Sequence, residues 1–277
     1  MLDPGGAPPG GVGGGAERGR RALGRRLWRE LRAVRMRLWD RRRYRRLVLE
    51  WVDGDLPLVV LPDVFNPKLL RSGEFLVRQL RRQPALLPAR GGRVLDLGCG
   101  SGVGGLVAAQ AGCQVVATDI NPAAVRCTRI NALLNGLDGQ IDVRGGDLFA
   151  PVVGERFETI LFNPPYYRGV PRDALDWAWR APDVVERFAA GLEAHLALGG
   201  AALLVLSSDG EAPSFLRALA EHGFTAQTVA THDFRNEQMW ISRISRAPAA
   251  LPPPRHAEPS PVTAPAAAVL PSAGERC

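Results

Sequence analysis

The sequence of 277 residues is poor in lysine, histidine and cysteine. Lys68 is its only lysine, and its four histidines are scattered along the chain. Its four cysteines form no Cys-x-x-Cys pair, and none lies near a histidine at the spacing of metal ligands. We therefore predict that the thiols are reduced and structural and that the protein binds no metal, which fits a cytoplasmic location.

Long apolar runs are missing as well. Runs such as residues 201–206 are far shorter than the roughly 20 residues that a membrane-spanning helix needs, so we expect no membrane span. Residues 1–16 are mostly glycine and proline, and no apolar segment follows them, which predicts no signal peptide. Hydrophobic residues still make up 46% of the chain, which is enough for the core of one full α/β domain.

Positive charge gathers near the start of the chain. Residues 17–46 contain 14 arginines and three acidic residues, a net charge of +11, whereas the remainder of the chain carries −4. Residues 19–45 are predicted to form a basic amphipathic helix because apolar residues recur there at helical spacing. These residues are Leu23, Leu27, Leu31, Val34 and Leu38.

Four interpretations of this basic arm, residues 19–45, remain open. One is binding to RNA or another polyanion. A second is docking on an anionic membrane surface or on a partner protein. A third is that translation begins at Met36, so that the upstream residues are an artefact of gene prediction. The last is a solvated helix without a ligand.

Changes in composition divide the chain into five predicted segments. The Gly/Pro-rich residues 1–18 and the Pro/Ala-rich residues 247–277 are predicted to be disordered, and they flank the arm and the folded part. Residues 46–90 are predicted to form a β-hairpin over 46–61 and a helix over 72–82, with Ser72 as its N-cap. Residues 91–246 form the main domain.

Strands and helices alternate through this main domain, which predicts an α/β fold with a parallel sheet and helices on both faces. The expected strands are 93–97, 114–118, 141–144, 158–162, 201–206, 224–230 and 239–244. The expected helices are 102–111, 122–136, 182–196 and 213–222. Asn121 is expected to cap the second helix, and Gly199-Gly200 to stop the third.

A glycine-rich turn follows the first of these strands. Gly98, Gly100 and Gly102 allow the backbone to turn tightly and to approach a ligand closely. Residues 100–105 also satisfy the Gly-x-Gly-x-x-Gly pattern of dinucleotide sites. Asp96, just before the turn, would repel a pyrophosphate but can take the cationic amino group of a methionine moiety. The turn therefore favours S-adenosylmethionine over a dinucleotide.

Two more acidic residues follow the next two strands. Asp119, with Ile120 after it, lies about 20 residues beyond the turn, the spacing at which a carboxylate reaches ribose hydroxyls. Asp147, with Leu148 after it, can accept a hydrogen bond from the exocyclic amine of adenine. Each also has a plainer interpretation, Asp119 as a helix cap and Asp147 as a turn former. Parallel strands bring their carboxyl ends to one sheet edge, where such ligands bind.

The segment Asn163-Pro164-Pro165-Tyr166 leaves the fourth strand at the same edge. The Asn163 side-chain oxygen and the Pro164 carbonyl can accept the two hydrogens of a target amino group, while the prolines fix the backbone. The Tyr166 ring can lie against a planar group. The nitrogen lone pair would then face the methyl sulfonium for in-line displacement, accelerated by positioning and by the two acceptors.

These motifs resemble those of the class I S-adenosylmethionine-dependent methyltransferases with an Asn-Pro-Pro-Tyr motif. Within that class the chain is similar to HemK-type release-factor glutamine methyltransferases and to their relatives that lack a large N-terminal domain. The resemblance covers about residues 60–245 and rests on residues 96–102, 119–121 and 163–166. It implies a Rossmann-like, mostly parallel seven-stranded sheet whose last strand, residues 237–245, is antiparallel.

The same resemblance implies roles for individual residues. Asp96, Gly98 and Asp119 would hold the cofactor, and Asn163 and Tyr166 would hold a substrate glutamine. Two segments depart from the family pattern, namely residues 70–74 and the continuation of the motif at 167–169.

Three functions remain open at this point. The favoured one is methylation of a glutamine side chain in a protein such as a translation factor. The same motif also serves the N6 amine of adenine in RNA or DNA, which the arginine-rich arm favours. The third is a non-catalytic RNA-binding module, against which the intact Asn-Pro-Pro-Tyr motif argues. The sequence leaves the substrate's identity and the oligomeric state open.

Overall fold

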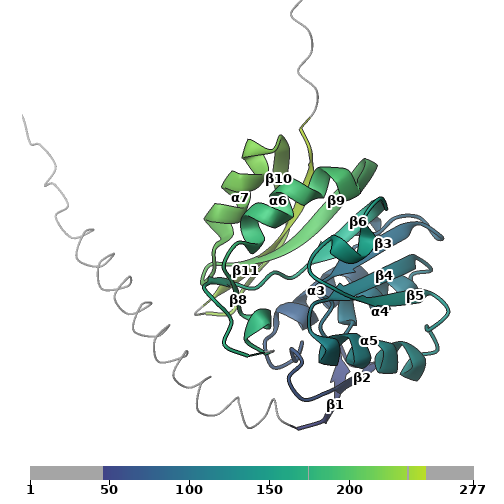
Figure 1. Ribbon diagram of the computed structural model, residues 1–277. Helices are drawn as coiled ribbons and strands as arrows, with labels where there is room; N and C mark the ends of the chain where they lie inside the picture. The colour runs from purple at the N-terminus through teal and green to yellow at the C-terminus, as the bar shows by residue number, and fades with distance from the viewer. Residues whose placement is uncertain (1–45, 174, 236, 248–277) are drawn as a thin grey trace, which may run out of the picture. The chain divides into compact units, whose positions relative to one another are not determined.

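The computed structural model describes residues 46–247 except 174 and 236. The basic arm and the two predicted disordered ends lie outside the described residues. The described part is built on a seven-stranded sheet in the order β10-β11-β9-β6-β3-β4-β5 (Figure 1). Its strands are β3 (Arg93–Leu97), β4 (Gln114–Asp119), β5 (Ile141–Gly145), β6 (Phe157–Phe162), β9 (Leu196–Ser207), β10 (Phe224–Asp233) and β11 (Gln238–Arg246).

The strand directions confirm the predicted fold class. β5, β4, β3, β6 and β9 are parallel neighbours, and β11 runs antiparallel to both β9 and β10. The last strand is therefore inserted between two earlier strands. All seven predicted strands are present.

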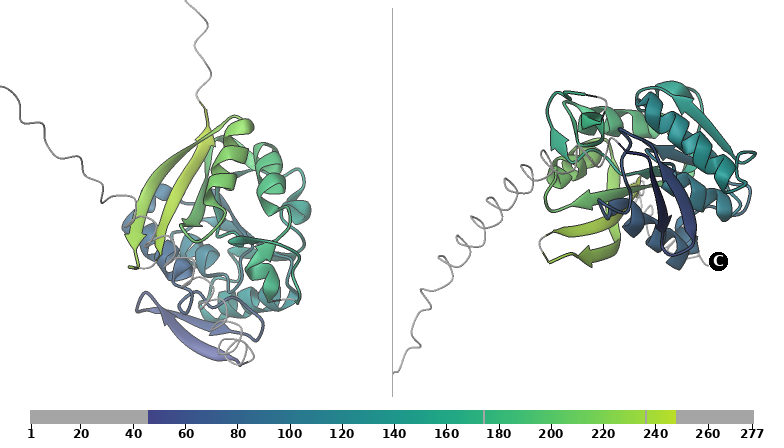
Figure 2. Two further views of the ribbon diagram at one scale, coloured as in Figure 1. Left: turned by 90° about the vertical axis from the view of Figure 1, so that its left-hand side faces the viewer. Right: turned by 90° about the horizontal axis from the view of Figure 1, so that it is seen from below.

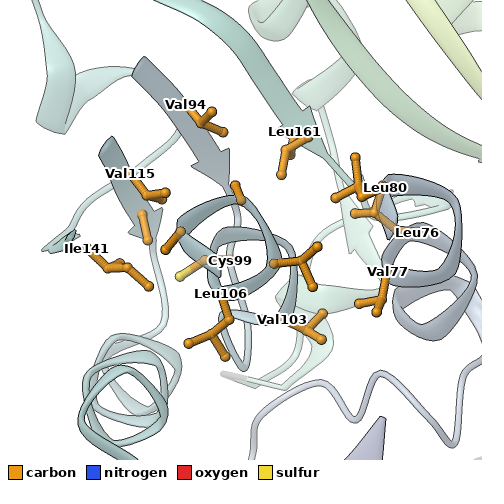
Figure 3. Packing of buried hydrophobic residues seen from close by; sticks show 14 of the residues in the cluster. Leu76, Val77, Leu80, Val94, Cys99, Val103, Leu106, Val115, Ile141 and Leu161 are labelled. Carbon is orange, nitrogen blue, oxygen red and sulfur yellow. The ribbon is translucent and has the colours of Figure 1, made fainter. Parts of the chain in front are cut away.

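Helices cover both faces of the sheet. α3 (Ser72–Arg82), α4 (Val103–Gln110) and α5 (Pro122–Leu134) share one hydrophobic cluster, and α6 (Val184–His195) and α7 (Ala212–Glu221) share a second. Alternate residues of β4, β6, β9 and β11 enter opposite clusters, as expected for strands buried on both faces. Figure 3 shows side chains of β3, β4, β6 and α3 meeting around α4, with Leu80, Leu106 and Leu161 among them.

Two local predictions about helix ends are wrong. Ser72 is the first residue of α3, and the N-cap is Arg71, which has a φ of 64° and makes no side-chain capping bond. Gly199 and Gly200 do not stop α6, which ends at His195, but lie inside β9. A Cβ on Gly200 would lie 2.9 Å from the Glu158 carbonyl oxygen, so glycine allows β9 to pass close to β6.

The predicted cap of α5 is confirmed. The Asn121 side-chain oxygen accepts a hydrogen bond of 2.9 Å from the Ala123 N–H, and Pro122 is the first helical residue. Asn121 and Pro122 both act on neighbouring residues, so the sequence pattern was sufficient to predict the start of the helix.

The predicted hairpin is also present, as β1 (Val48–Val52) and β2 (Leu56–Val60). It packs against α5 (Figure 2), where Asn131 accepts a hydrogen bond from the Val59 N–H at 2.7 Å and donates one to its carbonyl at 2.8 Å. This side chain closes the outer edge of β2 and fastens the hairpin to the main domain. In the described part of the chain, no helix is long and apolar enough to cross a membrane.

The remaining elements are short. They are η2 (Pro84–Leu86), η3 (Ala150–Val152), η4 (Asp176–Ala178), β7 (Tyr167–Arg168) and β8 (Arg180–Ala181). β7 and β8 pair with each other in parallel, so that the segment after the Asn-Pro-Pro-Tyr motif closes into a loop.

Candidate active site

A cavity of about 1180 Å³, counted with its open mouth, lies at the carboxyl ends of β3, β4, β5 and β6. All but three of the predicted site residues line it. Those that do are Asp96, Gly98, Gly100, Asp119, Ile120, Asp147, Leu148, Asn163 and Pro165. Gly102, Pro164 and Tyr166 lie outside its lining. The fold therefore brings segments from four strand ends to one site, as the order of the motifs predicted.

The glycine-rich turn has the backbone geometry that its glycines allow. Gly98 and Gly100 have φ values of 64° and 58°, in the left-handed region that favours glycine. Gly102, the N-cap of α4, also has a positive φ, and a Cβ there would come within 2.7 Å of Thr128. Gly102 thus serves the packing of the turn against α5, while Gly98 and Gly100 face the cavity.

Asp96 is a buried carboxylate at the end of β3. Its Oδ2 accepts a hydrogen bond of 2.7 Å from the Gly105 N–H in the first turn of α4. Burial raises the pKa of Asp96 to about 7, the hydrogen bond from Gly105 opposes that shift, and nearby Asp119 adds to it. A cation in the cavity would favour the ionised form, which suits the predicted contact with an amino group.

Asp119 joins the two turns that flank it. Its Oδ2 accepts from the Gly100 N–H and its Oδ1 from the Asn121 N–H, both at 2.8 Å. Burial raises the pKa of Asp119, and these backbone hydrogen bonds act in the opposite direction. The carboxylate therefore supports the start of α5 and also lines the cavity, so the capping and ligand-binding interpretations are compatible. A carboxylate has about four acceptor positions, so Asp119 can still accept a hydrogen bond from a ligand hydroxyl.

Asp147 is part of an ion pair that the sequence pattern did not reveal. Its Oδ2 lies 2.7 Å from Nη2 of Arg187 on α6, and Arg187 lines the cavity too. The guanidinium comes from 40 residues further along the chain, so only the tertiary structure identifies it. The predicted acceptor for adenine is thus held beside a cation and the apolar Leu148 and Val184.

Asn163 is held by hydrogen bonds at both ends of its side-chain amide. Its Nδ2 donates to Ser72 Oγ at 3.0 Å, and its Oδ1 accepts from the Tyr166 hydroxyl at 3.1 Å. The structure thus places the Tyr166 hydroxyl on Asn163, with Tyr166 outside the cavity lining.

Two segments supply lining residues that sequence reasoning missed. Phe65 and Pro67 come from the loop before α3, and Trp177 comes from η4. Phe65 also packs against Trp179, with ring centroids 5.8 Å apart. The tryptophans that follow the Asn-Pro-Pro-Tyr motif, Trp177 and Trp179, were the sequence feature from which this part of the site could have been predicted.

An ion cluster around the buried Asp176 orders the segment that contains Trp177 and Trp179. Asp176 accepts from Arg172 Nε at 2.8 Å, and its carboxylate also lies 3.3 Å from Arg180 Nε. Burial alone would raise the pKa of Asp176, but the two guanidinium groups hold it below its usual value. The cluster therefore fixes η4 and β8 at the mouth of the cavity.

The lining residues fit S-adenosylmethionine. Carboxylates suit its amino and ribose groups, and glycines at positive φ make room for the ligand beside the backbone. The Thr118 hydroxyl is buried at the cavity wall and has no hydrogen-bond partner among the described residues. A buried hydroxyl of this kind is costly unless a ligand or water satisfies it.

This sheet topology, with an acidic, glycine-rich cavity at its carboxyl edge, defines the class of S-adenosylmethionine-dependent methyltransferases. Residues 55–234 match the family described as methyltransferase small domain, and the chain belongs to that family. Its cofactor is S-adenosylmethionine.

Curated relatives give the same class. The chain is 33% identical over 162 residues to ribosomal RNA small subunit methyltransferase C of Alcanivorax borkumensis, covering 58% of this chain and 45% of the relative. The protein of that name from Yersinia enterocolitica is 30% identical over 198 residues, covering 70% and 52%. The chain therefore spans about half the length of these relatives.

Solved structures show the same fold. The T. thermophilus 16S rRNA N2 G1207 methyltransferase, in complex with AdoMet and guanosine, superposes with a TM-score of 0.54 at 24% identity, covering 71% of this chain and 50% of that one. The ribosomal protein L11 methylase of Lactobacillus delbrueckii has a TM-score of 0.50 at 22% identity, covering 71% and 89%.

Proposed function

We propose that this chain transfers the methyl group of S-adenosylmethionine to a planar NH2 group, and that the group belongs to a base in RNA. The observation that carries the proposal is the Asn163 amide, held at the cavity with its oxygen in a defined position. A carbonyl oxygen accepts two hydrogen bonds, so Oδ1 can accept one from Tyr166 and one from a substrate N–H.

The cofactor supplies an electrophilic methyl group on a sulfonium. We assign its amino group to Asp96, its ribose to Asp119 and Ile120, and its adenine to Asp147 and Leu148. Gly98, Gly100 and Gly102 shape the backbone beneath it. These residues line or support one cavity that also contains Asn163.

The chain's own contribution to the chemistry is positioning and charge stabilisation. Asn163 Oδ1 and the Pro164 carbonyl accept the two N–H groups, which directs the nitrogen lone pair toward the methyl carbon. A new N–C bond forms as the S–C bond breaks with its electron pair, and the nitrogen then loses a proton to solvent. Acceptors at the nitrogen stabilise the positive charge that develops there.

Two observations favour an RNA base. The curated relatives named above are ribosomal RNA methyltransferases. The cavity lining includes the aromatic rings of Phe65 and Trp177, and single bases in RNA are commonly held by stacking on such rings. The exocyclic amine of guanine or of adenine satisfies the same two acceptors.

A glutamine side chain in a protein is the second candidate, supported by the resemblance of residues 163–166 to the HemK-type motif. A non-catalytic RNA-binding module has less support, because the motif is intact and its amide is held in place.

The test is methyl transfer from labelled S-adenosylmethionine to ribosomes and to total RNA from cells that lack the protein, with an Asn163→Ala chain as the control. We expect nuclease-sensitive label, recovered as an N-methylated nucleoside by mass spectrometry. Protease-sensitive label in methylglutamine would replace the RNA assignment by the second candidate. An absence of transfer to either pool would overturn the catalytic proposal.

A further inference from the structure

We propose that Ser72, the first residue of α3, is a positioning residue that holds the Asn163 amide in place at the site. The inference rests on the proposed role of Asn163 as the acceptor for the substrate amine. Ser72 is fully buried, and its Oγ accepts a hydrogen bond of 3.0 Å from Asn163 Nδ2 across 91 residues of sequence.

The orientation matters because the two ends of a carboxamide have nearly the same shape but opposite hydrogen-bonding character. With Oδ1 toward the substrate, the amide accepts from an NH2 group. If the amide turned over, its own NH2 would face the substrate NH2, and two donors would meet. Ser72 at the nitrogen and Tyr166 at the oxygen hold the amide plane from opposite ends, and because either hydroxyl can donate or accept, the substrate NH2 itself selects the oxygen as its acceptor.

The backbone around Ser72 is held in a conformation that leaves the hydroxyl little freedom. Arg71 has a φ of 64°, an uncommon value for a residue with a side chain. The Ser72 N–H donates to the Leu70 carbonyl at 2.7 Å. A Cβ on Gly73 would lie 2.4 Å from Pro67 Cβ, so glycine alone allows α3 to begin this close to the preceding loop.

The preceding loop is fastened in turn to the hairpin. Asn66 Oδ1 accepts from the N–H groups of Lys68 and Leu69 at 3.0 and 2.9 Å, and its Nδ2 donates to Glu50 of β1 at 3.2 Å. On the other side, the Arg71 guanidinium lies over the Phe234 ring at 5.3 Å. Residues 46–90 therefore complete the site, because they hold the hydroxyl that keeps the Asn163 amide in place.

The kinetic test compares Ser72→Ala, which removes the acceptor, with Ser72→Thr, which keeps a hydroxyl. Ser242→Ala is the matched control, since Ser242 is similarly buried in β11, whereas the hydrogen bond to Asn163 is made by Ser72. On the substrate that the labelling experiment identifies, we expect Ser72→Ala to lower kcat by about 10- to 100-fold. The Kd for S-adenosylmethionine should change less than twofold. Ser72→Thr should recover most of kcat, and Ser242→Ala should resemble the wild type.

A second readout needs no substrate and no active enzyme. In the full chain labelled with ¹⁵N-asparagine, the side-chain NH2 signal of Asn163 is identified by its loss in Asn163→Ala. We expect Ser72→Ala to shift this signal and to speed its exchange with water, while Ser242→Ala leaves it in place.

Several results would overturn the inference. They are an unchanged Asn163 amide signal in a folded Ser72→Ala chain, an unchanged kcat, or an equal loss of cofactor affinity. A Ser72→Thr chain that folds but behaves like Ser72→Ala would also exclude the hydroxyl as the cause. If Asn163→Ala itself keeps full turnover, the proposed function fails, whereas the NMR result still decides whether Ser72 holds the amide.

Discussion

The two halves of the cavity are held together in different ways. On the side of the glycine-rich turn, Asp96 and Asp119 accept hydrogen bonds from backbone N–H groups no more than 19 residues away. On the side of the Asn-Pro-Pro-Tyr motif, Asn163 is held by the side chains of Tyr166 and of Ser72, the latter 91 residues away. Backbone donors survive most substitutions of the residues that carry them, whereas a side-chain hydroxyl is lost in a single substitution.

This contrast predicts that substitutions on the side of the Asn-Pro-Pro-Tyr motif lower turnover and leave cofactor affinity nearly unchanged. Asn163→Ala removes the acceptor and should lower kcat by at least about 100-fold, the loss typical for a group that stabilises developing charge. Calorimetry should give a Kd for S-adenosylmethionine within about twofold of the wild type. If the Asn163→Ala chain had wild-type turnover, or lost much of its cofactor affinity, the proposed difference between the two halves would be wrong.

On the turn side the expected effect is the reverse. Asp119→Ala leaves the N–H groups of Gly100 and Asn121 without their acceptor and removes the proposed ribose ligand. We expect cofactor affinity to fall about tenfold and stability by about 1–3 kcal/mol. Calorimetry and chemical denaturation measure the two effects. An unchanged Kd with lower stability would reduce Asp119 to a structural role.

The pH dependence of cofactor affinity tests the role of Asp96 on the side of the glycine-rich turn. The pKa of Asp96 is raised to about 7, so the carboxylate is largely protonated at pH 6 and gains its charge as the pH rises. Affinity for the cationic amino group should increase about tenfold between pH 6 and pH 7.5. Asp96→Asn should abolish this slope. An identical slope in both chains, measured by calorimetry, would remove Asp96 from the amino-group site.

The raised pKa of Asp96 also makes the free energy of unfolding depend on pH. Because the folded chain holds the Asp96 proton to a higher pH than the unfolded chain, this group's contribution to stability is greatest below pH 4. It declines as the pH rises from about 4 to about 7. Asp96→Asn should remove that part of the pH dependence of the unfolding free energy, which denaturation in the absence of cofactor measures.

The smallest effect is expected from a deletion in the basic arm, which belongs to neither half of the cavity. Deleting residues 1–35 removes much of the positive charge of the arm, so RNA affinity should fall a few-fold and depend less on salt. Cofactor affinity should not change. Binding to labelled RNA at several salt concentrations measures both effects. A deletion that leaves RNA affinity and its salt dependence unchanged would support translation from Met36.

Much of the cofactor side could be predicted from sequence because its signals are local. The glycines of the turn, Asp96 just before it, and Asp119 after the next strand each follow from the βα pattern in which they stand. Asn121 and Pro122 likewise specify the start of α5 within three residues. The alternation of strands and helices was sufficient for the α/β class and for the sheet edge at which the site forms.

Other features depended on contacts that no local pattern encodes. Ser72 has the sequence context of an N-cap, but a strained Arg71 takes that position, and the hydroxyl is used by Asn163 instead. Gly199-Gly200 has the composition of a helix stop, but the pair is needed where β9 passes close to β6. The partner of Asp147 lies on α6, 40 residues away.

The sequence by itself thus determined the class of fold, the acidic glycine-rich turn and the presence of the Asn-Pro-Pro-Tyr motif, because each depends on neighbours along the chain. The tertiary structure decided where the Asn163 amide is held, through its hydrogen bonds with Ser72 and Tyr166. The physical reason is that Ser72 lies 91 residues from Asn163 in sequence, so that only the folded chain brings the hydroxyl and the amide into contact.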